Sequence, residues 1–174
     1  HPVGVVEAFM ATWSRARQTY GQPAPTAGAV YDQSASLRGF KEDVERAEPG
    51  TRWQGGAAAA YSAANAAHAQ VLGKLAELDA RLAVEIDKSA QVVTAGRAEL
   101  DSVRDWVLSA ASSAPPDRTG EFMKMPIVSK GLARVSEVMV KSNAELNAIG
   151  ANIRQIGAEY AALEAQKFGS APTQ

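Results

Sequence analysis

The chain has 174 residues, a length that suits one domain or one extended helical unit. Its formal net charge is −1 and its acids and bases are interspersed, so it has no basic stripe for a phosphate backbone, and we expect no nucleic-acid partner. It contains no cysteine, which excludes disulfides and thiolate chemistry, and much of its 46% apolar content is alanine, which favours slender helices over a thick core.

Residues 3–20 are predicted to form the first helix, because Val5, Phe9 and Trp13 recur close to the helical period. The stretch "YGQPAPTAG" ends it with two prolines and two glycines. The short apolar start has no basic region before it and no cleavage site after it, so we expect no secretory signal peptide. No stretch approaches the ~18 apolar residues of a membrane span, so no transmembrane segment is predicted.

A second helix is predicted over residues 27–47, where Val30, Leu37 and Phe40 share one side. It stops at the Pro-Gly pair of "EPGTRWQGGAAAAY". The glycines after the tryptophan lack the lysine and the preceding strand that a phosphate-binding loop requires, so that chemistry is not predicted here.

A third helix is predicted over residues 56–113, which contain no helix breaker. Its large apolar residues are spaced by threes, fours and sevens, as in a coiled-coil seam. These seam residues are Val71, Leu75, Leu78, Leu82, Ile86, Val93, Leu100, Val103 and Val107.

The proline-rich stretch "SSAPPDRTGEFMKMP" is predicted to separate this helix from a last one over residues 127–166. In the last helix Ser142 fills the one gap of a second apolar seam, and residues 167–174 are predicted to be a flexible tail. The seam residues are Val135, Val138, Leu146, Ile149, Ile153, Ile156, Tyr160 and Leu163.

The predicted fold class is therefore all-α: a single domain over residues 1–174, forming an elongated antiparallel helical bundle on one very long central helix. Short turns make consecutive helices antiparallel neighbours, so residues 30–47 should pack on the first half of the long helix and residues 127–166 on its second half. The first helix could pack on this chain or on another.

Catalytic, metal and cofactor sites are not predicted. His68 is the only internal histidine and has no neighbouring ligand or base at a useful spacing, so it reads as a packed or half-exposed helical side chain. The acids Glu77, Asp79, Glu85 and Asp87 alternate with basic residues and indicate a solvated helix face, with Glu77 and Arg81 as an i, i+4 pair. We expect no cofactor, no metal, no small-molecule substrate and no enzymatic activity.

Trp53 and Gly55 stand in the predicted turn at residues 53–56, between two helices. The tryptophan could simply cover the open end of the hairpin. Trp-x-Gly in such a turn also looks like the WXG proteins exported by type VII secretion systems of actinobacteria. "AEPGTRWQGGAAAAY", with "LAELDARL" and "SAQVVTAGRAEL" in the long helix after it, resembles more narrowly the N-terminal region of EspA/EspE-like substrates, over about residues 20–107.

The same resemblance implies a Tyr-x-x-x-Asp/Glu export signal near the end of a helix. "YAALE" supplies it with Tyr160 and Glu164, one turn apart on one helix face, where a translocation ATPase or a partner could read both. The alternative is that Tyr160 continues the apolar seam and Glu164 is solvated.

Two departures limit the resemblance. In EspA/EspE-like proteins the region after the long helix is strongly hydrophobic, whereas residues 127–166 are amphipathic here. In the usual WXG pair the Trp-x-Gly of one chain meets the tyrosine signal of its partner. With a turn near Asp117, folding instead places Tyr160 opposite roughly Asp79, far along the helix from Trp53, so a partner or a second copy would have to complete the composite site.

The resemblance implies a secreted or envelope-associated substrate or effector of a type VII system, acting through a small helical WXG-type partner or through self-association. These residues could also be the targeting part of a longer toxin. The alternative from a different class is a helical adaptor that uses its coiled-coil seam to bind a partner and is not exported.

Overall fold

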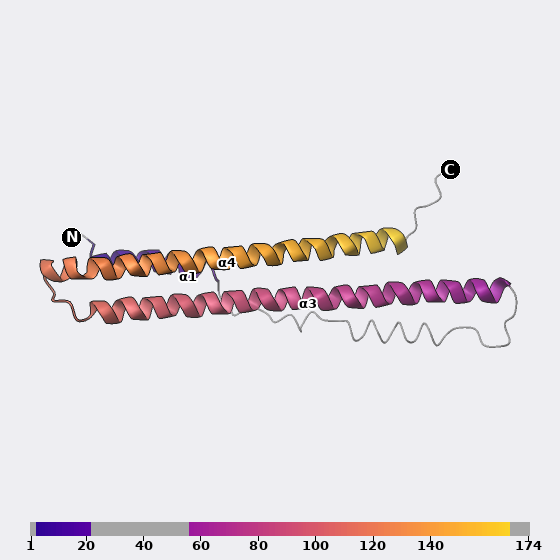
Figure 1. Cartoon of the computed structure of the whole chain (residues 1–174), viewed down its shortest axis with the longest axis horizontal. Helices are drawn as coiled ribbons and strands as arrows, with labels where there is room; N and C mark the ends of the chain where they lie inside the picture. The colour runs from indigo at the N-terminus through magenta and orange to yellow at the C-terminus, as the bar shows by residue number, and fades with distance from the viewer. Residues whose placement is uncertain (1–2, 22–55, 168–174) are drawn as a thin grey trace. The chain divides into compact units, whose positions relative to one another are not determined.

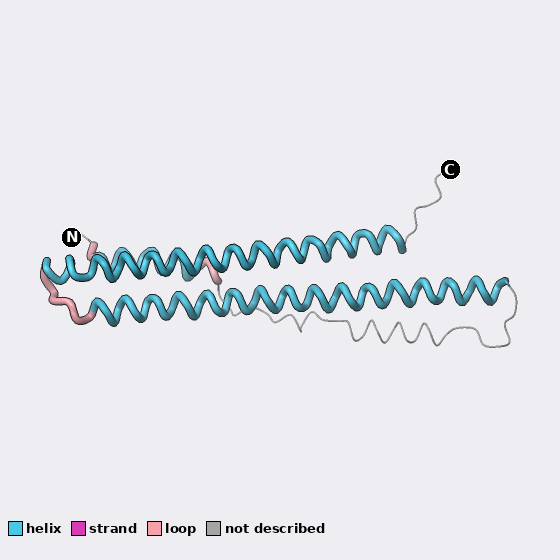
Figure 2. The backbone as a smooth tube through the Cα atoms, in the orientation of Figure 1, coloured by secondary structure: helices cyan, strands magenta, loops and turns pink. Residues whose placement is uncertain are grey.

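A computed structural model describes residues 3–21 and 56–167 of the chain, with the side chains of residues 56–62 and 167 left aside. The described residues form three α-helices and no strand (Figure 1, Figure 2), which confirms the predicted helical fold for them. The helices are α1 (Val5–Gln18), α3 (Gly56–Ala111) and α4 (Arg118–Lys167). The predicted helix over 27–47, Trp53 and Gly55 of the WXG turn, and the tail after residue 167 lie outside the described residues.

The start of α4 differs from the position that the sequence suggests. The helix begins at Arg118 and contains Pro126, whereas the proline-rich stretch was expected to delay it to about residue 127. Asp117 caps the earlier start, because its carboxylate accepts a hydrogen bond from the Gly120 N–H at 2.9 Å. Pro126 removes only one backbone hydrogen bond, and the helix continues through it.

The chain divides into two compact units. Of the described residues, 3–21 and 88–149 belong to unit 1, and 56–87 and 150–167 belong to unit 2. Both α3 and α4 contribute to each unit, so the two helices pair twice, on two different sets of side chains.

Unit 1 packs α1 against both long helices. Phe9 is fully buried. Helix α1 runs parallel to α4, since the Val5 N–H donates to Glu121 at one end and the Tyr20 hydroxyl donates to Ser142 at the other. It therefore runs antiparallel to α3. Gly131 lets the helices approach closely: a Cβ there would lie 2.5 Å from Val107 and 3.0 Å from the Phe9 ring. The buried core of unit 1 is Phe9, Trp13, Ala16, Tyr20, Leu100, Val103, Val107, Val128, Val135 and Val138.

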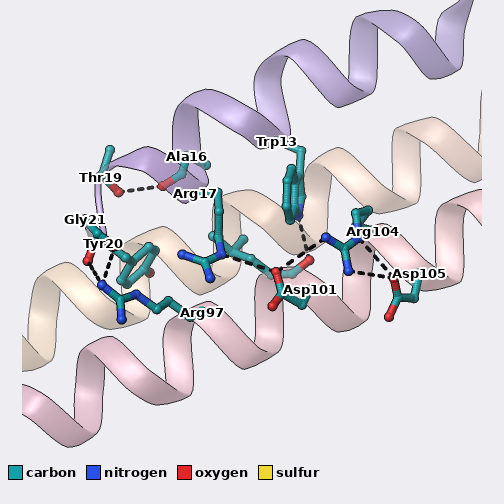
Figure 3. Close-up of polar contacts among 11 residues, drawn as sticks. Trp13, Ala16, Arg17, Thr19, Tyr20, Gly21, Arg97, Asp101, Arg104 and Asp105 are labelled. Atoms are coloured by element: carbon teal, nitrogen blue, oxygen red, sulfur yellow. Dashed lines mark hydrogen bonds and ion pairs between the residues drawn. The ribbon is translucent and has the colours of Figure 1, made fainter. Parts of the chain in front are cut away.

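Polar side chains fix the register of α1 on α3 (Figure 3). The Trp13 indole N–H donates to the Leu100 carbonyl at 2.6 Å, and Arg104 lies over the Trp13 ring, 5.0 Å from its centroid. Arg17 forms an ion pair with Asp101 at 3.2 Å. A tryptophan that is both packed and hydrogen-bonded holds a helix in one position better than packing alone.

The gap in the α4 seam at Ser142 has a structural explanation. Ser142 is buried, and its hydroxyl oxygen accepts a hydrogen bond of 2.7 Å from the Tyr20 hydroxyl. A Cβ on Gly96 would lie 2.4 Å from the same tyrosine ring, so the glycine makes room for it on α3. The serine therefore anchors the end of α1 by a buried polar contact at a seam position.

We predict that Ser142→Ala lowers the free energy of unfolding by about 1–3 kcal/mol, because it leaves the Tyr20 hydroxyl buried without an acceptor. The exposed Ser136→Ala on the same helix is the control, with an expected change within about 0.5 kcal/mol. Urea unfolding followed by circular dichroism measures both. Equal stability of the two variants would contradict the role assigned to this contact.

We predict opposite effects from two glycine-to-alanine changes in α4. Gly131→Ala should destabilise by about 1–3 kcal/mol through the clash with Val107 and Phe9. Gly157→Ala has nothing within 4 Å of the new Cβ, and it should stabilise by about 0.5–1 kcal/mol through helix propensity. Thermal unfolding of both variants tests this; a stabilising Gly131→Ala would show that the close approach is not needed.

Candidate functional site

The predicted signal residues Tyr160 and Glu164 lie near the C-terminal end of α4, in unit 2. Here α4 runs antiparallel to α3. The buried contact between the two helices is a small cluster of Leu78, Ile156 and Leu163. Tyr160 packs against this cluster as a half-buried side chain.

The Tyr160 hydroxyl donates a hydrogen bond to the Asp79 carboxylate on α3. This confirms the pairing of the two residues that antiparallel folding predicted. Burial raises the pKa of Tyr160 above its ordinary value, and the hydrogen bond to Asp79 and the negative charge of that carboxylate raise it further. The phenol is therefore held in its neutral, hydrogen-donating form.

Glu159, next to Tyr160, holds the same turn of α4 on α3. Its two carboxylate oxygens accept from the Arg81 guanidinium at 3.0 and 2.7 Å, and Lys74 lies 3.5 Å away. The hydrogen bond from Arg81 is the main reason that the pKa of Glu159 is lowered, with the positive charges adding to it. Arg81 also lies 3.9 Å from Glu77, the i, i+4 pair that the sequence predicted.

Glu164 is exposed, and it makes no hydrogen bond or ion pair among the described contacts. One turn of α4 thus carries a tyrosine held against α3 and an acid that faces solvent. The spacing of the two residues is as predicted, but only the acid is freely available. Trp53 and Gly55 lie outside the described residues, so the structure does not relate them to this turn.

The acids of α3 do not all lie on a solvated face, so that interpretation was wrong for two of them. Asp79 accepts from Tyr160, and Glu85 is buried and accepts from the Asn152 amide at 3.1 Å. Local charge alternation identified them as acids among bases but gave no indication of which side meets α4. The antiparallel register predicted from the sequence pairs Tyr160 with Asp79, and it could have identified Asp79 as an acid that contacts α4.

His68 is exposed and lines an open groove of about 620 Å³ between α3 and the end of α4. Val71 and Leu163 contribute to the apolar part of this groove, and Lys74 and Glu159 to its polar part. Within residues 3–21 and 56–167 no three side chains of the metal-binding types come together. None of the described helices is long and apolar enough to cross a membrane.

We predict that unfolding stability falls as the pH rises above about 10, and that Tyr160→Phe removes this component. The folded state raises the pKa of Tyr160, so its contribution is fully present below the ordinary tyrosine pKa of 10.0 and is lost as the pH rises above it. The slope from one group is at most about 1.4 kcal/mol per pH unit. Urea unfolding at pH 9 and pH 10.5 measures it, and equal slopes in both proteins would contradict the assignment.

The model of the EspA/EspE family matches residues 20–102, just under half of the chain. No curated protein and no solved structure matches it significantly. The match confirms the resemblance that the sequence indicated, and it supports an EspA/EspE-like type VII secretion substrate.

Proposed function

We propose that this chain is a non-enzymatic substrate or effector domain of a type VII secretion system, secreted or bound to the cell envelope. The match of residues 20–102 to the EspA/EspE family is the observation that carries the proposal. The domain acts by helix-mediated association with a small helical WXG-type partner or with another copy of itself.

In this proposal Tyr160 and Glu164 form the export signal. Their support is geometric: they stand one turn apart on a well-formed helix that ends at Lys167, and the acid is exposed. Both residues lie beyond the region that matches the family, so the signal is proposed from the resemblance to WXG proteins and from the geometry of these two residues. Trp53 and Gly55 shape the recognition turn.

Association is supported by apolar side chains on the solvent side of α4. Phe122, Met125, Leu132 and Val140 are exposed, and their intervals of three, seven and eight residues keep them on one side of the helix. Exposed apolar side chains that share one helix face are a candidate interaction surface. The same surface favours the second candidate function, a helical adaptor that binds a partner and is not exported.

Export from the natural host into the culture medium separates the two functions. Tyr160→Ala and Glu164→Ala, at equal intracellular levels, should each reduce export by about tenfold, the effect of losing one charge-assisted contact with the secretion machinery. Trp53→Ala tests the recognition turn in the same assay. The exposed Glu145→Ala on α4 is the matched control and should be exported normally.

Circular dichroism of each variant excludes loss of helix as the cause. Normal export of both Tyr160→Ala and Glu164→Ala would contradict the signal. Retention of the unmodified protein inside the cell, together with stable capture of a partner, would favour the adaptor.

A further inference from the structure

The proposed signal is closed in this structure. A partner that reads a tyrosine and an acid together needs both side chains, but the Tyr160 hydroxyl already donates to Asp79 of the same chain. Its ring is half-buried against the cluster of Leu78, Ile156 and Leu163. Only Glu164 is open to solvent.

Asp79, the acceptor in this contact, is not one of the two signal residues, and it lies within the region that matches the EspA/EspE family. It lies on α3, 81 residues before Tyr160, and it is half-buried. Its charged neighbours along α3 are Glu77 and Arg81, and Arg81 uses both terminal nitrogens on Glu159 of α4. Among the described contacts, the hydrogen bond from Tyr160 joins the Asp79 carboxylate to α4.

We propose that Asp79 is a positioning residue that holds the Tyr160 side chain against α3, and that recognition of the signal requires the hydroxyl to leave Asp79 for an acceptor on the partner. This inference rests on the proposed function. Under this proposal, the pairing of α4 with α3 and the recognition of the signal by a partner compete for the Tyr160 hydroxyl. A variant without the Asp79 acceptor therefore presents both signal residues.

The test compares Asp79→Ala, which removes the acceptor, with Asp79→Asn, which keeps an acceptor oxygen at the same position. Glu99→Gln is the matched control, because it weakens a different α3–α4 contact, the 3.3 Å ion pair with Lys141 in unit 1. Each variant is made in the full chain, and export from the natural host is measured at equal intracellular levels.

Phenolate absorbance, with the Tyr160→Phe protein as reference, reports whether the hydroxyl has been released. In Asp79→Ala it should ionise at lower pH than in the unmodified protein, because the acceptor and its charge are gone. Hydrogen exchange of the amides of the last turns of α4 should rise by about tenfold, corresponding to one lost hydrogen bond to a charged group.

We expect Asp79→Ala to be exported faster than the unmodified protein, and Asp79→Asn and Glu99→Gln to be exported at its rate. Unchanged or slower export of Asp79→Ala, in a protein whose Tyr160 titrates as released and whose export still needs Tyr160, would overturn this inference alone. Export that does not depend on Tyr160 would overturn the proposed function, and this inference with it.

Discussion

The antiparallel pairing of α3 with α4 is the constraint on which the other features depend. In unit 1 this pairing places Val107 beside Gly131 and leaves a surface on which α1 packs through Phe9 and Trp13. In unit 2 it places Asp79 beside Tyr160 and Arg81 beside Glu159. A shift of register by one residue would turn each of these side chains by about 100° around its helix and would break both sets of contacts.

The two units are held by different kinds of contact. Unit 1 has a continuous apolar core in which polar groups such as Ser142 and the Trp13 indole are satisfied within the unit. Among the described residues of unit 2 the apolar cluster is smaller, and carboxylates on both helices bind across the pair. Replacing such polar contacts with a partner's groups costs less free energy than opening a buried apolar core. The proposed signal lies in unit 2, among these polar contacts.

The sequence was sufficient for the helical fold because two long apolar seams repeat at threes and fours. Antiparallel folding of those seams was enough to pair Tyr160 with Asp79. The role of Ser142 could not be predicted, because its partner Tyr20 is 122 residues away and on a different helix. Glu85 was misassigned for a related reason: charge alternation describes one helix alone, whereas burial depends on the neighbouring helix.

The double-mutant cycle of Asp79→Ala and Tyr160→Phe tests most directly the claim that the Tyr160 hydroxyl holds α4 on α3. We predict a coupling free energy of about 1 kcal/mol or more between the two side chains, as for a partly buried hydrogen bond to a carboxylate. Additive effects of the two substitutions would mean that Asp79 does not hold Tyr160, and would contradict the proposal that this contact keeps Tyr160 from a partner.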